Sequence, residues 1–401
     1  MKPFTGAGVT FELFLFSLGA IAGGLLSAVL GARFGRRVSI LALAVPDLLG
    51  WILVAAAQNL PMMLAGRFLS GLAAAGYSPN IQIFVAEITE ARHRGWLSGL
   101  TLPMMSIGVL LMYTLGSWLP WHWAAASCTA VPVILAASLY TYHDSPYWYF
   151  SIGKEKAAHA ALEQFRGPGA NIVSEVFTIQ QHLNETEEDI TFGQAVLKLV
   201  TEKKYFQPFI ILNFLFFLMI FSGKYTIDFY AVDFFKMTGS HVDEYVSAVI
   251  VAFVHLVGSL LFIALVKKTS RKLLLCVSAL TMGVSLLILG VSMFYSTYSD
   301  WVPLVCTLLY MLAAPLGLTS IPFLYMAEFY PSELRSVLAG LTTMLTNIMM
   351  AVLLKTFSSL DSLLGHHGVS WLYAAACFGS IIFSLSYVPE TKDKVSPALA
   401  F

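Results

Sequence analysis

Long apolar stretches alternate with short polar ones along almost the whole chain. Eleven of them reach about 20 mostly apolar residues, the length that a helix needs to cross about 30 Å of hydrocarbon. The first five are Phe11–Leu30, Val38–Ala57, Pro61–Ala86, Trp96–Leu119 and Trp121–Tyr140, and the last six are Phe206–Val232, Val246–Val266, Lys272–Phe294, Val302–Tyr325, Val337–Leu360 and Val369–Val388. The pattern predicts an all-α polytopic membrane protein, because an open sheet edge cannot satisfy its backbone in lipid and the alternation of a membrane barrel is absent.

One longer polar stretch divides the spans into a group of five and a group of six. It contains the turn-forming Gly167-Pro168-Gly169 and the acidic run Glu185–Asp189. We therefore expect four parts: an N-terminal transmembrane bundle (1–140), a solvated linker (141–205), a C-terminal transmembrane bundle (206–388) and a short tail (389–401).

Composition narrows the function classes. Apolar residues make up 58% of the chain and charged residues 11%, against about 45–50% and about 25% in soluble proteins. A soluble enzyme or a nucleic-acid binder is excluded on this ground. The 23 basic and 23 acidic residues cancel, so no charged patch is expected to recruit a partner. The four cysteines are far apart in apolar runs, and no Walker motif or zinc-ligand spacing is present, so we expect no metal and no cofactor.

The positions of Lys and Arg predict the orientation in the bilayer. In the loops, all but three of these residues fall in one set of alternating loops, and the exceptions are Lys2, Lys236 and Lys355. Because basic residues are retained on the cytoplasmic side, we expect the 141–205 linker and the C-terminus to be cytoplasmic.

The two groups of spans carry matching loops. The matching pairs are Gly31–Arg37 with Val266–Lys272, Glu87–Arg94 with Glu328–Arg335, and His143–Pro146 with Pro389–Lys392. Parallel repeats of this kind build transporters with a substrate site between the halves. Two spans precede the basic loop in the second half but only one in the first, so the helix matching the extra span would lie before residue 1.

These motifs resemble those of the sugar porters of the major facilitator superfamily, and the chain is most similar to the insect facilitated glucose or trehalose type. The resemblance covers Phe11 to Lys392 and includes Gly66-Arg67 and His143–Trp148. It implies two bundles of six helices each, of which the first helix is missing here. It also implies a plasma-membrane carrier that is not an enzyme, whose partners are a small sugar-like solute and the lipid bilayer and not a nucleic acid.

Charged residues at the predicted cytoplasmic helix ends are candidates for gating. They are Arg36, Arg37, Glu87, Arg94, Arg271, Glu328 and Arg335. Charge pairs that bridge helices there can hold the cytoplasmic side closed and break as the halves move. The alternative is that these residues only set the topology. The pattern occurs in both halves, which favours gating.

The central positions depart from the family pattern. The resemblance implies glutamines where this chain has Leu102, Met219 and Ile220, which predicts weak hexose binding. It places substrate contacts at Tyr225, His255, Phe323, Thr343 and Asn347. Lys224 and Asp228 are also candidates because charged residues at membrane depth are rare and functional. They are four residues apart and can instead satisfy each other, and His255 can instead be a hydrogen-bonded core residue.

The leading hypothesis is facilitative transport of a hexose, trehalose or a similar small polar solute by alternating access. Two other functions remain open at this point. One is a sensor or binding member of the family that does not transport. The other is a carrier of a non-sugar organic solute, for which Lys224, Asp228 and His255 would supply the polarity.

Overall fold

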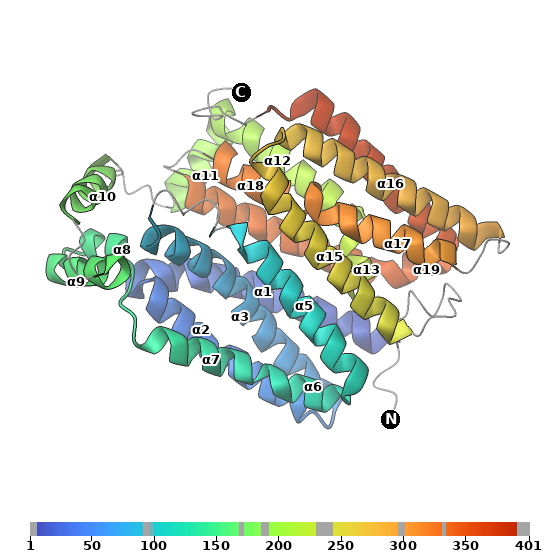
Figure 1. The fold of residues 1–401 in the computed structure, drawn as a ribbon, viewed down its shortest axis with the longest axis horizontal. Helices are drawn as coiled ribbons and strands as arrows, with labels where there is room; N and C mark the ends of the chain where they lie inside the picture. The colour runs from blue at the N-terminus through green and yellow to red at the C-terminus, as the bar shows by residue number, and fades with distance from the viewer. Residues whose placement is uncertain are drawn as a thin grey trace. The chain divides into compact units, whose positions relative to one another are not determined.

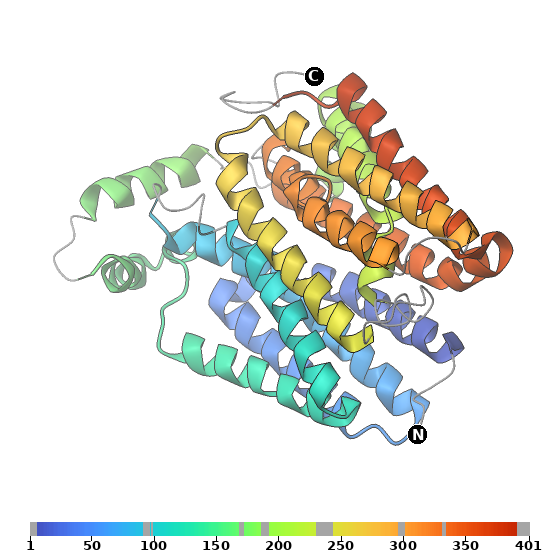
Figure 2. The same ribbon diagram turned by 45° about the vertical axis from the view of Figure 1, so that its right-hand side comes forward.

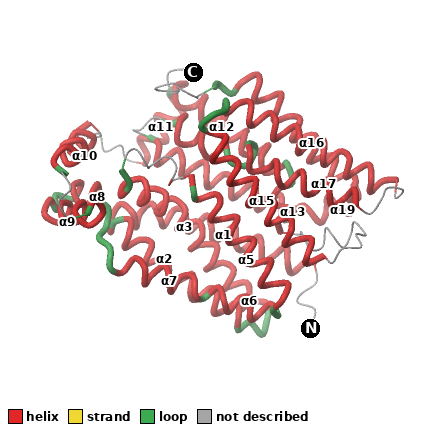
Figure 3. The backbone as a smooth tube through the Cα atoms, viewed as in Figure 1, coloured by secondary structure: helices red, strands yellow, loops and turns green. Residues whose placement is uncertain are grey.

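The computed structural model describes residues 6–90, 97, 99–167, 172–185, 192–229, 244–295, 301–330 and 334–390. Every regular element in these ranges is helical (Figure 3). Ten helical segments of this described part are long and apolar enough to cross a membrane. The prediction of an all-α polytopic membrane fold is therefore confirmed.

Backbone contacts divide the chain into two compact units. One unit comprises Met1–Thr101 and Pro120–Thr191, and the other comprises Leu102–Leu119 and Phe192–Phe401. The short insertion 102–119 thus groups with the second unit. The domain boundaries expected from the sequence stay a prediction.

The first unit is built on three long helices. α1 (Gly6–Phe34) and α2 (Arg36–Ala55) both pack against α3 (Leu60–Ile88), and all three lie side by side in Figures 1 and 2. The remaining described helices of this unit are α6 (Trp121–Cys128), α7 (Ala130–Tyr140), α8 (Pro146–Ser151), α9 (Glu155–Arg166) and α10 (Val173–Glu185). α6 ends at Cys128 because Pro132, four residues later, has no N–H to donate to the Cys128 carbonyl.

α3 differs in character from the other predicted spans. It is 29 residues long, but it is not among the ten segments apolar enough to cross a membrane. Its glycines, Ser70, Asn80 and Arg67 lower its hydropathy, and the Arg67 Nε lies 3.6 Å from Glu12 Oε2 of α1. Gly66 lies against α2 and Gly71 lies against α1, so these small residues form helix contacts and not a lipid-facing surface.

Glycines allow α1 and α3 to approach at backbone distance. A Cβ added at Gly19 would lie 2.1 Å from the Phe68 carbonyl oxygen, and one at Gly23 would lie 1.9 Å from that of Leu72. On the facing helix, a Cβ at Gly71 would lie 2.1 Å from the Phe16 carbonyl oxygen. Small residues make such close helix contacts in membranes, and the small-residue runs Gly19–Gly24 and Gly71–Gly76 are typical of such an interface.

Gly23→Ala is expected to destabilise the first unit by about 1–3 kcal/mol, because the methyl group would overlap backbone atoms that cannot rotate away. Gly24→Ala is the matched control, since nothing lies within 4 Å of a Cβ at that position. Thermal denaturation in detergent, followed by size-exclusion chromatography, measures both. Equal melting temperatures for the two variants would show that the interface is not tightly packed.

The described part of the polar 141–205 stretch contains four helices. α8, α9 and α10 fall in it, and so does α11 (Phe192–Thr201) of the second unit. Arg166 at the end of α9 donates through Nη1 to the carbonyl of Ile88 at 2.6 Å. The Glu175 carboxylate of α10 accepts from Arg166 Nε at 2.9 Å and from Nη2 at 2.5 Å, and these bonds raise the pKa of the Arg166 guanidinium above its ordinary value. These contacts fix α9 and α10 to the end of α3.

The second unit contains the remaining helices of the described chain. They are α5 (Thr101–Trp118), α11, α12 (Lys203–Phe221), α13 (Lys224–Phe229), α15 (Glu244–Val266), α16 (Arg271–Tyr295), α17 (Trp301–Ala313), the 3₁₀ turn η1 (Ala314–Leu316), α18 (Ile321–Phe329) and α19 (Arg335–Tyr387). α19 packs along both α16 and α12, and α17 packs on α15 and α16.

Two predicted spans of this unit are broken into shorter helices. The span 206–232 is interrupted between α12 and α13, and the span 302–325 is interrupted at η1, where Pro315 and Gly317 lie. The last two predicted spans both lie in α19, which contains two candidate membrane spans, Val337–Phe357 and Ser359–Tyr387. α19 runs through the expected loop at 361–368 and changes direction at Gly365, whose φ of 68° lies in the left-handed region that favours glycine.

Candidate functional site

A buried carboxylate closes the start of α2 in the first unit. The Asp144 carboxylate accepts from the backbone N–H of Arg36 at 3.0 Å and of Arg37 at 3.1 Å, and Asp144 is only 2% exposed. These N–H groups have no partner within their own helix. An anion at this position also interacts favourably with the positive end of the helix dipole. Asp144 therefore fixes the 141–146 loop to α2.

Arg36, the first residue of α2, connects this helix to α3. Arg36 Nη2 donates to Glu87 Oε1 of α3 at 2.9 Å. The Arg37 side chain donates to the carbonyls of Leu139 (2.8 Å) and Tyr140 (2.6 Å) at the end of α7. The two arginines thus connect α2 to α3 and to α7.

The second unit repeats the same arrangement. Glu390 accepts from the backbone N–H of Arg271 and of Lys272, both at 3.2 Å, at the start of α16. Arg271 forms an ion pair with Glu328 of α18. Each unit thus holds an acid at a helix N-terminus and an ion pair from the first arginine of that helix to a glutamate.

The sequence identifies most of these residues but not their partners. Arg36, Glu87, Arg271 and Glu328 are brought together in pairs. Arg94 and the side chain of Arg335 lie outside the described residues. Asp144 and Glu390 are absent from the predicted site, although a helix N-terminus beginning with two cations needs an anionic partner. That signal, with the matched acids after the last span of each half, could have identified them.

The predicted substrate residues lie around the break between α12 and α13. Gly223 has a φ of 90°, and a Cβ there would lie 2.3 Å from the ring of Tyr373. The chain can turn here only with glycine, for both reasons. Tyr310 Oη donates to the freed carbonyl of Ser222 at 3.0 Å, and Thr226 bonds the hydroxyl of Tyr373 at 2.9 Å. The break is thus stabilised by α17 and α19.

Lys224 and Asp228 form the ion pair that their spacing predicts. The Lys224 ammonium also lies 5.8 Å from the centre of the Tyr225 ring. The backbone carbonyl of Asp228 accepts from the hydroxyl of Tyr113 on α5. The ion pair thus neutralises both charges within the unit, and the Tyr113 contact holds the backbone at Asp228.

His255 on α15 presents a polar atom without a partner. Its Nδ1 lies 3.1 Å from the Ser106 hydroxyl of α5. That hydroxyl also donates to the carbonyl of Leu102 at 3.1 Å, and the histidine tautomer that satisfies both contacts is the one in which Nδ1–H donates to it. Nε2 then carries a lone pair, and within the described chain this buried atom has no hydrogen-bond partner. An unsatisfied buried acceptor needs a donor from elsewhere.

The remaining predicted substrate residues have separate contacts within the second unit. Phe323 is 39% exposed and packs edge-to-face on Phe216 at 5.0 Å. Thr343 bonds the carbonyl of Ala339 in its own helix at 2.8 Å, and Asn347 is partly exposed one turn later. Met219 and Ile220, in place of the expected glutamines, are 1% and 0% exposed.

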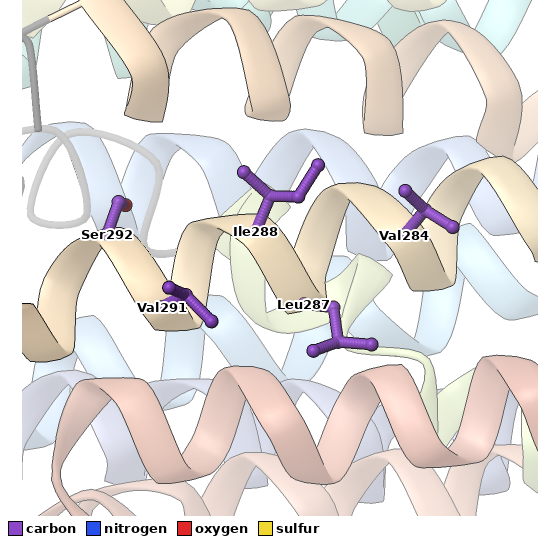
Figure 4. Close-up of a pocket in the computed structure, with 5 residues that line it drawn as sticks. All are labelled: Val284, Leu287, Ile288, Val291 and Ser292. Atoms are coloured by element: carbon purple, nitrogen blue, oxygen red, sulfur yellow. The ribbon is translucent and has the colours of Figure 1, made fainter.

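A shallow depression on α16 offers no polar chemistry. Its lining, shown in Figure 4, consists of Val284, Leu287, Ile288, Val291 and Ser292. The Ser292 hydroxyl already bonds the carbonyl of Leu289 at 2.7 Å. The depression is therefore suited to aliphatic chains of lipid rather than to a polar solute.

Comparison with known families identifies the chain. The family of sugar (and other) transporters matches residues 8–395. The chain belongs to this transporter family. Trehalose transporter 1 of Drosophila melanogaster is 32% identical over 386 residues, which cover 95% of this chain and 45% of that protein. A facilitated trehalose transporter of Bombyx mori is 31% identical over 386 residues, which cover 95% and 76%. This family member thus spans less than half of the Drosophila relative.

Solved structures confirm the predicted fold class of this family member. The proton:xylose symporter XylE bound to 6-bromo-6-deoxy-D-glucose matches with a TM-score of 0.80 at 23% identity, over 98% of this chain and 88% of that chain. The inward-open xylose transporter XylE from E. coli matches with a TM-score of 0.80 at 21% identity, over 98% and 89%. The fold is therefore that of the major facilitator superfamily, as predicted.

Proposed function

We propose that this chain forms the membrane-embedded part of a facilitative carrier that moves a small polyol, such as trehalose or a hexose, by alternating access. The observation that carries the proposal is the polar break between α12 and α13 inside a membrane span. Discontinuous helices form the solute sites of many carriers, because their unwound backbone and flanking side chains can face a solute. The family match and the trehalose transporters among the relatives support a sugar as the solute.

The chemistry around the break suits a neutral solute better than an ion. Lys224 and Asp228 neutralise each other, so an organic ion would have to displace one of them. His255 Nε2 needs a hydrogen-bond donor, which a sugar hydroxyl supplies. Solute contacts are proposed at Lys224, Tyr225, Asp228, His255, Phe323, Thr343 and Asn347.

Gating is assigned to the repeated charge clusters. We place Arg36, Arg37, Glu87, Arg94, Arg271, Glu328 and Arg335 on the cytoplasmic side, which follows from the distribution of basic residues in the loops. Pairs of this kind can form in one state and break in the other. The plasma membrane is the proposed location, with the 141–205 segment and the C-terminus in the cytoplasm.

Uptake of radiolabelled trehalose and glucose into oocytes tests this function. We expect saturable uptake that is unchanged by dissipating the proton gradient and that exceeds uptake by water-injected cells. Surface biotinylation controls for delivery to the plasma membrane. Sugar binding without uptake would support the sensor hypothesis, and uptake of organic ions alone would support a non-sugar carrier. Either result would overturn the proposal.

A further inference from the structure

α11 carries apolar side chains that the second unit does not cover. Leu197 is 63% exposed and Val200 is 69% exposed. On the other side of the same helix, Leu199 is only 6% exposed, and α11 packs against α12. The helix thus has one apolar side held by the protein and a neighbouring apolar side open to its surroundings.

The chain places this open side next to the membrane. The candidate span of α12 begins at Lys203, and only Glu202 separates it from the end of α11. Three residues span at most about 11 Å, so Val200 lies within that distance of the span's first residue. The interfacial layer of a bilayer is about 5–7 Å thick on each side. A span that begins at the hydrocarbon edge at Lys203 would place Val200 in or directly beside that layer.

Basic residues surround the same segment. Lys203 and Lys204 are exposed, Lys198 lies on the polar side of α11, and Glu202 is the acid between them. A helix with exposed aliphatic residues and neighbouring lysines is the type that lies in the plane of the interface. The cytoplasmic leaflet carries anionic headgroups that attract such lysines.

We propose that α11 lies on the cytoplasmic surface of the bilayer as an interfacial helix. Leu197 and Val200 insert at the boundary of the acyl chains, and Lys203 and Lys204 contact anionic headgroups. The end of the 141–205 segment is then a lipid-bound anchor for α12 and not a solvated linker. The choice of leaflet rests on the proposed orientation, whereas the membrane contact does not depend on the transported solute.

Depth-dependent fluorescence quenching tests the contact in the full chain. A fluorescent amino acid is introduced by amber suppression at 197, at 200 or at 198, and each variant is reconstituted into nanodiscs. Lys198 is the matched control because, at 3.6 residues per turn, it lies about 100° from Leu197 and about 160° from Val200 around the helix. We expect lipids brominated near the headgroup to quench the probe strongly at 197 and 200 and weakly at 198, and iodide to show the opposite order.

Nanodisc composition tests the lysines. With the probe at 200, brominated phosphatidylserine should quench more than brominated phosphatidylcholine, and K203Q with K204Q should remove that preference. Strong iodide quenching at all three positions would show a solvated helix. Protection from both quenchers at 197 and 200 would show that protein covers the surface. Either result overturns the proposal, and neither affects the uptake assay.

Discussion

Asp144→Ala is expected to lower the free energy of unfolding of the first unit by about 2–5 kcal/mol. The substitution removes the acceptor of the Arg36 and Arg37 N–H groups at the start of α2, where both hydrogen bonds are partly buried. It also releases the N–H of Ser145, which bonds the same carboxylate at 2.7 Å. Thermal denaturation in detergent measures the loss.

Two variants make this measurement specific. Asp144→Asn keeps one accepting oxygen and should give an intermediate loss. Glu163→Ala removes an exposed carboxylate from α9 in the same unit and should cost little. If Asp144→Ala melts at the temperature of Glu163→Ala, the carboxylate does not hold the loop to α2.

The repeat allows a comparison between the units. Glu390 accepts the corresponding N–H groups of α16 in the second unit, but it is partly exposed where Asp144 is buried. Solvent can replace some of the bonds that Glu390→Ala removes, so the same substitution should cost less there. Asp144 and Glu390 thus both accept hydrogen bonds from the N-terminus of a helix, one in a buried and the other in a partly exposed position.

The sequence predicts the spans well because lipid imposes a simple length and polarity rule on them. It predicts their interruptions poorly, since the breaks at Gly223 and η1 lie inside continuous apolar runs. Their cause is a local one: a positive φ at Gly223, and a proline with a nearby glycine at η1. The loop expected at 361–368 is reduced to a kink at Gly365, where a non-helical φ of 68° and ψ of 166° separate two helical stretches.

The sequence is limited in the same way when it is used to predict which charged residues pair. The i,i+4 spacing of Lys224 and Asp228 predicts a pair, and the structure contains it. Glu87 instead pairs with Arg36, 51 residues away, and Glu328 with Arg271, 57 residues away. Periodicity describes neighbours on one helix, but packing of separate helices decides which distant charges meet. Ser106 is the partner of His255 for the same reason, at a separation of 149 residues.

His255→Phe is expected to raise the KM for sugar uptake by about 2–12-fold. A neutral hydrogen bond to a bound hydroxyl contributes about 0.5–1.5 kcal/mol, and 1.4 kcal/mol is a factor of ten in affinity. Phenylalanine retains the aromatic ring but has no acceptor in place of Nε2. His255→Gln, whose amide oxygen can accept, should recover part of the loss. Phe253→Leu, an exposed position on the same helix, is the control.

Substrate analogues separate a solute contact from a structural effect of His255. A deoxy sugar that lacks the hydroxyl bound by Nε2 should bind the unmodified protein weakly, and the His255→Phe variant should not distinguish it from the parent sugar. Ser106→Ala removes the acceptor that fixes the ring tautomer and should weaken uptake less than His255→Phe, because Nε2 remains. If His255→Phe lowers uptake of every analogue by the same factor, the residue supports the α5–α15 contact and does not touch the solute.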